Sequence, residues 1–81
     1  MGKRVFNRSV EYFKNYKMAE KFILENKGKV EEDYDLGNIT MNIVPVEGRV
    51  RLEVITYEGS SVCATIVYIG KPTLAVHGID D

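Results

Sequence analysis

Residues 38–69 predict three strands joined by two tight turns, and in the first two strands apolar side chains recur with a period of two, the pattern of half-buried β-strands. Glu47-Gly48 predicts a two-residue turn, because glycine tolerates the positive φ that such turns need. With that turn, the apolar residues of the inner face meet one another, Ile43 opposite Leu52 and Met41 opposite Val54, while Asn42 stands opposite Glu53 and Thr40 opposite Ile55. A slip of one residue would scramble these faces, so the pattern predicts a β-hairpin in this register. Pro45 cannot donate a ladder hydrogen bond, which favours an edge strand or a position near the turn.

A second turn at residues 58–61 leads into a third predicted strand, residues 62–69. One face of this strand carries Cys63, Thr65, Val67 and Ile69, and the other carries Val62, Ala64, Ile66 and Tyr68. Because both sets are mostly apolar, both faces are expected to be covered, and the pattern leaves open which set points inward. Gly70-Lys71-Pro72 predicts a further turn, followed by a short edge strand at residues 73–77.

The region from about Arg8 to Lys27 contains neither glycine nor proline, and its periodicity predicts an amphipathic helix. Its apolar stripe consists of Tyr12, Tyr16, Ala19 and Ile23, widened by Phe13 and Leu24. Asn7 or Ser9 is expected to cap the start of this helix, and Gly28 to follow its end. Away from the stripe lie a basic ridge, formed by Lys14, Lys17 and Lys21, and an apolar pair, formed by Met18 and Phe22.

These elements predict one α+β domain over residues 1–81. We expect a two-layer sandwich in which one long N-terminal helix packs on a four-stranded antiparallel meander, in the order α-β-β-β-β. A chain of 81 residues buries only a small core, and small proteins often add a disulfide, a metal or association with a second chain. Cys63 is the only cysteine, so an internal disulfide is excluded, and association is the remaining device.

The charge balance excludes a strong global attraction to nucleic acid or anionic lipid. The formal net charge is −1, with 28% charged residues, and the pI is about 5.8. The N-terminus lacks the apolar run of a signal peptide, and no segment approaches a membrane span. We expect a cytoplasmic protein that needs neither membrane nor cofactor.

The acidic stretch of residues 28–37 carries Glu31, Glu32, Asp33 and Asp35. An EF-hand needs acids at alternate positions, a mid-loop glycine and a later glutamate, and this stretch lacks that layout. We interpret it as a solvated loop. The alternative is an acidic patch that docks on a basic protein surface.

Catalytic patterns are weak along the chain. Cys63 and His77, with Asp35 to orient the histidine, are the residue types of a nucleophilic dyad. However, Cys63 is expected to be packed in a strand, and burial disfavours the reactive thiolate. No glycine-rich phosphate loop occurs, and two soft ligands are too few for zinc. We therefore predict a non-enzymatic protein.

The predicted function is protein binding through the sheet face that the helix leaves uncovered. That face carries Val44, Ile55 and Tyr57 and, on the third strand, Ile66 and Tyr68. A contiguous apolar patch on a small monomer favours a homodimer or another protein partner. Site-free, single-cysteine chains of this size are frequent among regulatory or inhibitory proteins of bacteria and phages, which favours that role by association.

A second candidate surface on the helix consists of Lys14, Lys17, Lys21, Met18 and Phe22. The alternative function is nucleic-acid binding, either through these lysines or through the tyrosine-bearing sheet face.

Overall fold

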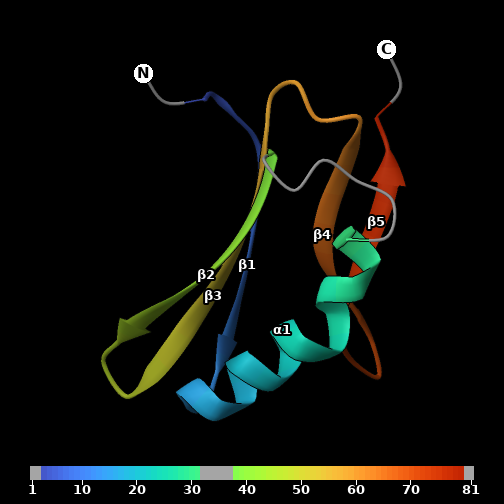
Figure 1. The fold of residues 1–81 in the computed structure, drawn as a ribbon. Helices are drawn as coiled ribbons and strands as arrows, with labels where there is room; N and C mark the ends of the chain where they lie inside the picture. Colours follow the sequence, from blue (N-terminus) through green and yellow to red (C-terminus); the bar gives the residue numbers. More distant parts are fainter. Residues whose placement is uncertain (1–2, 32–37, 80–81) are drawn as a thin grey trace.

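The computed structural model describes residues 3–31 and 38–79 of the chain. The elements follow in the order β1 (Val5–Phe13), α1 (Tyr16–Glu31), β2 (Ile39–Val46), β3 (Arg49–Tyr57), β4 (Val62–Ile69) and β5 (Lys71–Gly78). The strands form two antiparallel sheets, one of three strands in the order β1-β3-β2 and one hairpin of β4 and β5 (Figure 1). The α+β class is confirmed, whereas the four-stranded meander after a leading helix is wrong.

The β2–β3 hairpin confirms the predicted register. Ile43 stands opposite Leu52 and Met41 opposite Val54, and Val46 and Arg49 flank the turn. Gly48 has a φ of 76°, the left-handed conformation that the short turn demands. β2 is an edge strand of the three-stranded sheet, so Pro45 interrupts no central ladder.

The largest correction concerns the N-terminus, where the predicted helix is replaced by a strand. Residues 5–13 form β1, which pairs with β3 and makes β3 the central strand. Ser9 and Glu11 lie on the inner side of β1, so polar residues occupy positions where an alternating pattern would show apolar ones. The third strand was expected beside β3, but β1 takes that place.

Helix α1 consequently begins later, and its buried face is only partly the predicted one: Ala19 of the predicted stripe is buried and Ile23 packs against the core. Asn15, rather than Asn7 or Ser9, caps it, because the Asn15 Oδ1 accepts a hydrogen bond from the Met18 N–H at 3.0 Å. Among residues 16–29 of the helix, Ala19, Phe22 and Asn26 are buried, whereas Tyr16 of the predicted stripe is 56% exposed. Gly28 lies inside the helix, which continues to Glu31.

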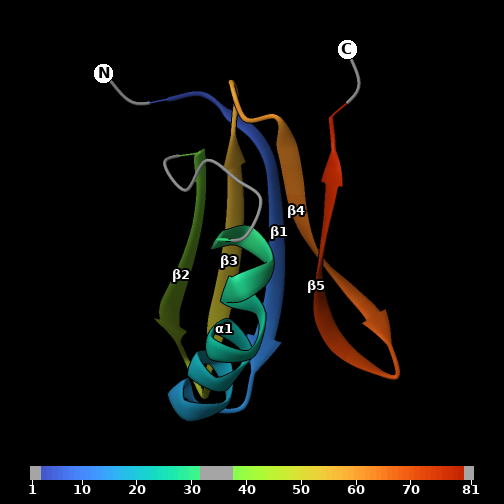
Figure 2. The same cartoon turned by 45° about the vertical axis from the view of Figure 1, so that its right-hand side comes forward.

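The β4–β5 hairpin is joined to the rest of the molecule by side chains rather than by a continued sheet (Figure 2). On the β4 side, the N–H groups of Ala64 and Ile66 donate to the hydroxyls of Thr56 (3.1 Å) and Ser9 (3.0 Å). On the β5 side, the Leu74 N–H donates to Asn26 Oδ1 at 3.2 Å, and Lys29 Nζ donates to the Leu74 carbonyl at 3.0 Å. Strand and helix thus seal both edges of this hairpin.

The core lies between the three-stranded sheet, α1 and the hairpin. Its buried members are Phe22, Ile39, Leu52, Val54, Val62, Ala64 and Leu74. Val62 and Ala64 belong to this cluster and Ile66 packs against it, so the even-numbered residues of β4 face inward. Both covering elements lie on one side of the three-stranded sheet, and the opposite side is left for the candidate site.

Candidate functional site: the open face of the three-stranded sheet

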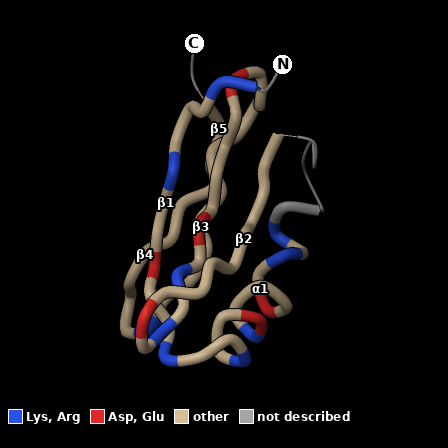
Figure 3. Tube along the Cα trace, turned by 90° about the vertical axis from the view of Figure 1, so that its left-hand side faces the viewer, with Lys and Arg blue, Asp and Glu red and all other residues tan. Residues whose placement is uncertain are grey.

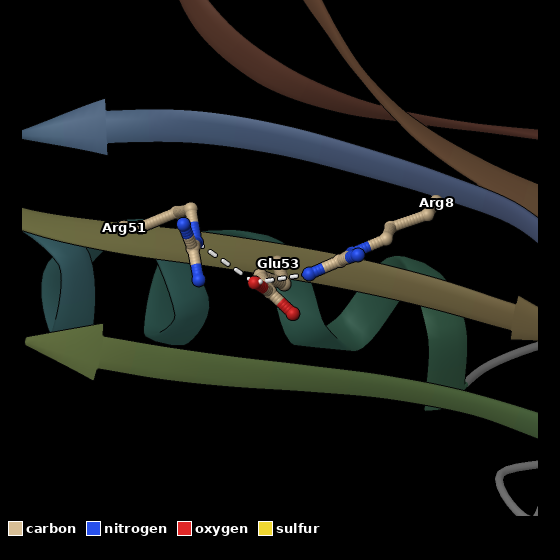
Figure 4. A network of polar contacts seen from close by, with 3 residues as sticks. All are labelled: Arg8, Arg51 and Glu53. Carbon is tan, nitrogen blue, oxygen red and sulfur yellow. Dashed lines mark hydrogen bonds and ion pairs between the residues drawn. The ribbon is translucent and has the colours of Figure 1, made fainter.

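The outer face is the side of the three-stranded sheet that points away from the core. Side chains alternate between the two faces of a strand, so the strand register defines its members. They are Arg8, Val10 and Tyr12 of β1, Arg49, Arg51, Glu53, Ile55 and Tyr57 of β3, and Thr40, Asn42, Val44 and Val46 of β2. Figure 4 shows α1 behind the sheet, and no described element covers this face.

An ion-pair network occupies the centre of the outer face (Figure 4). One carboxylate oxygen of Glu53, Oε2, lies 2.6 Å from Arg8 Nη2 and 2.8 Å from Arg51 Nε. The hydrogen bond from Arg8, together with the charges of both arginines, holds the pKa of Glu53 below its usual value despite burial. The Glu53 side chain is only 8% exposed, whereas those of Arg8 and Arg51 are 53% and 30% exposed. The network therefore presents positive charge to solvent and hides the negative charge.

Tyr12 is held between two further arginine contacts. The guanidinium carbon of Arg49 lies 4.1 Å from the centroid of the Tyr12 ring, a cation–π geometry. A side-chain hydrogen bond with Tyr12 is the largest cause that raises the pKa of Arg51, with the Glu53 charge adding to it. The same tyrosine thus orders two arginines at one end of the face.

The outer face combines charged, aromatic and aliphatic side chains. Arginine and tyrosine, the types enriched at interface hot spots, are interleaved with aliphatic side chains. Val10 and Tyr12 are exposed, and Val44, Ile55 and Tyr57 are half-buried. Three arginines and one glutamate give the face a formal charge of +2.

The structure divides the predicted protein-binding residues between two places. Val44, Ile55 and Tyr57 lie together on the outer face. Ile66 packs against the core, and Tyr68, although 62% exposed, forms a hydrogen bond with Glu11 on the inner side. That hydrogen bond, followed by burial, raises the pKa of Tyr68. The two β4 residues therefore do not extend the outer face.

Sequence reasoning missed Arg8, Val10 and Tyr12 as members of this face, because they were assigned to a helix. Their alternation with Ser9 and Glu11 is a period-two pattern, and it is the signal from which a strand could have been predicted. It was outweighed by an equally regular helical spacing of aromatic residues.

The second candidate surface is only partly formed. Lys14, Lys17, Lys21 and Met18 are exposed, but Phe22 is 4% exposed and belongs to the core. Figure 3 shows basic positions gathered at the end of the molecule where β1 runs into α1. A cleft of about 240 Å³ lies between α1 and the β4–β5 turn, and its lining includes Met18, Lys21 and Pro72.

The remaining candidates are placed as follows. Glu32, Asp33 and Asp35 lie outside the described residues, and Glu31 is the last residue of α1. Cys63 stands opposite His77 in the β4–β5 register, but Cys63 is buried and His77 is exposed, and Asp35 is not described. Among residues 3–31 and 38–79, no cluster of three potential metal ligands occurs. None of the helices described could cross a membrane.

Comparison of the chain with protein-family models, with curated proteins and with solved structures found no match.

Proposed function

We propose that this chain is a non-catalytic protein-binding domain that presents its outer face to an acidic surface of another protein, in a regulatory or inhibitory role. The observation that supports the proposal is the uncovered outer face, with Arg8, Arg49 and Arg51 beside the exposed rings and aliphatic groups. Apolar side chains provide the buried area, and the exposed arginines select the charge of the partner.

The charge of the outer face favours a different protein over a second copy stacked upon it. Each face carries +2, and its only carboxylate already lies between Arg8 and Arg51. Two such faces in contact would bring together six arginines and two glutamates, and each glutamate is already paired with arginines of its own chain. Like charges across an interface disfavour association. A partner with exposed carboxylates faces no such repulsion.

Nucleic-acid binding is the second candidate, and the distribution of charge favours it. All eleven basic residues lie in the described ranges, whereas five of the twelve acidic residues lie at 32–35 and 80–81, so the described part carries a net +4. The placement of the tyrosines weighs against it. Tyr12 stands opposite Arg51, six residues from Tyr57 along β3, so the backbone positions that carry the two rings are about 20 Å apart along the strand. Bases stacked on neighbouring rings need closer spacing.

The experiment compares Arg49→Glu with Lys17→Glu as baits for affinity capture from nuclease-treated host lysate. Both variants make the same charge change at exposed positions, one on the outer face and one on α1. The captured protein is then purified, and its dissociation constant is measured with each variant. We expect Arg49→Glu to weaken binding about tenfold, as the loss of an interface arginine does, and Lys17→Glu to leave it unchanged.

Two results would contradict the proposal. The first is binding that weakens equally in both variants, which would place the contact away from the outer face. The second is capture that disappears after nuclease treatment, together with a steep fall in affinity for generic single-stranded RNA or DNA as salt rises. That second result supports nucleic-acid binding instead.

A further inference from the structure

The outward edge of β2 differs from the outward edges of β4 and β5. In the described part of the chain, N–H groups at the edges of β4 and β5 donate to side-chain oxygens of Thr56, Ser9 and Asn26, and the Leu74 carbonyl accepts from Lys29. The Tyr12 N–H at the edge of β1 donates to the Glu11 carboxylate at 3.1 Å. No described strand or side chain hydrogen-bonds to the outward edge of β2.

The backbone groups that point outward from β2 follow from its pairing with β3. Opposed residues in an antiparallel pair alternate between hydrogen-bonded and non-hydrogen-bonded pairs, and a two-residue turn is closed by a hydrogen-bonded pair, here Val46 with Arg49. Pro45 and Val50 then form a non-hydrogen-bonded pair. This agrees with the chemistry of proline, which has no N–H to donate to β3. Within the described part of the chain, the N–H groups of Ile39, Met41 and Ile43 are the donors left unpaired at the outward edge.

β2 also lacks the usual protection of an edge strand. Ile39–Val46 contains no charged residue, and its one proline stands near the end of the strand. Exposed edges are normally blunted by lysine, by bulges or by a covering element, because they are templates for pairing with another chain. A second copy of an uncharged strand meets no like-charge repulsion, in contrast to a second copy of the outer face.

We propose that β2 pairs antiparallel with β2 of a second copy about a two-fold axis, which joins the two three-stranded sheets into one six-stranded sheet. This dimer goes beyond the proposed function and does not depend on it. One register uses every free donor: Met41 opposite Met41 of the second copy, with Ile39 opposite Ile43 on either side. Registers displaced toward the turn place Pro45, which has no N–H, at a donor position.

The proposed register brings Asn42 of the second copy opposite Thr40. The Thr40 hydroxyl oxygen is buried and has no hydrogen-bond partner within the described part of the chain. A cross-strand amide on the same face is a suitable donor for it. The pairing also leaves both outer faces on the same side of the enlarged sheet, available to a partner.

Light scattering during gel filtration at micromolar concentration gives the first readout. The expected mass is twice the 9.2 kDa of the chain. Met41→Pro removes a donor from the outward edge without removing a ladder bond to β3, and we expect a folded protein of monomer mass. A monomer mass for the wild type at every concentration overturns the proposal. That result would also be obtained if a strand of another protein, rather than a second copy, pairs with this edge.

Disulfide trapping tests the register and does not depend on the proline variant folding. In a Cys63→Ala background, Thr40→Cys and Asn42→Cys are made as separate proteins. Non-hydrogen-bonded neighbours lie about 4.5 Å apart between Cα atoms, within the range for a disulfide, so an oxidised equimolar mixture should give a covalent dimer. Each protein alone should not, because identical positions are displaced by two residues in this register. Equal cross-linking of each protein alone, or none in the mixture, overturns the β2 pairing.

Discussion

The three-stranded sheet and the β4–β5 hairpin are built from similar strands but are stabilised in different ways. In the sheet, β3 has a strand neighbour on each side, and the ladders satisfy its backbone groups. In the hairpin, the outward backbone groups are satisfied by hydroxyl, amide and ammonium groups of Thr56, Ser9, Asn26 and Lys29. A strand can therefore be integrated into a small domain by a few polar side chains instead of a neighbouring strand.

The difference predicts unequal local stability. Opening the hairpin breaks the side-chain hydrogen bonds at its edges and removes Val62, Ala64 and Leu74 from the core. Opening the central sheet disrupts the core around Leu52 and Val54 and also breaks the ladders on both sides of β3. Local unfolding free energies follow such differences in packing and hydrogen bonding. The experiments below are arranged from the largest expected effect to the smallest.

Leu52→Ala should destabilise the whole domain most. Leu52 is fully buried on the central strand, and truncation of such a residue costs about 2–5 kcal/mol of unfolding free energy. Urea denaturation measures this loss. Leu24→Ala, at an exposed position of α1, is the control and should change stability by less than about 0.5 kcal/mol. Similar losses in the two variants would contradict the assigned core.

Asn26→Leu should loosen the hairpin more than the sheet. The buried Asn26 side chain accepts from the Leu74 N–H and donates to the Phe22 carbonyl, and leaving such groups unsatisfied costs about 1–3 kcal/mol. Hydrogen exchange should accelerate at β4 and β5 amides while β2–β3 amides keep more of their protection. Glu20→Leu, at an exposed position of the same helix, is the control. Uniform acceleration in both sheets would show that the hairpin is not a separate unit.

Thr56→Val tests the opposite edge of the hairpin. Valine keeps the branched shape but loses the hydroxyl that accepts the Ala64 N–H, at an expected cost of about 1–2 kcal/mol. Thermal denaturation measures the loss. Thr65→Val makes the same substitution at a half-buried position of β4 and is the control for the effect of replacing threonine by valine. An unchanged melting temperature for Thr56→Val would mean that this hydrogen bond does not secure β4.

The smallest effect concerns the Glu53 network and depends on pH. The pKa of Glu53 is lower in the folded protein than its ordinary value of 4.5, so the folded state binds this proton more weakly than the unfolded state. Its stabilisation is therefore complete above pH 4.5 and is lost as the pH falls below 4.5 through the folded pKa. The melting-temperature advantage of wild type over Glu53→Gln should shrink between pH 7 and pH 3.

Glu58→Gln is the control for the pH series. Glu58 is half-exposed and pairs with Arg4 at 3.8 Å, a surface contact of little value. Its effect on the melting temperature should be small at every pH. A wild-type advantage over Glu53→Gln that stays constant down to pH 3 would contradict the role assigned to the arginines.

The sequence by itself determined the β2–β3 hairpin, because strict alternation and a glycine turn admit one register. It also determined the extents of β4 and, more roughly, β5, and three residues of the candidate site, namely Val44, Ile55 and Tyr57. These features depend on neighbours a few residues apart. Local propensity and period-two patterning therefore contain the necessary information.

Only the tertiary structure decided which strands are neighbours. Residues 8–13 fit a helix by spacing, yet they form a strand because β3 offers a vacant edge and because β4 satisfies the polar inner side at Ser9. That one choice moved the helix start to Tyr16, added Phe22 and Asn26 to the buried face of α1 and brought Arg8 and Tyr12 onto the outer face. The Glu53 network joins residues 45 positions apart, and no local pattern encodes such a contact.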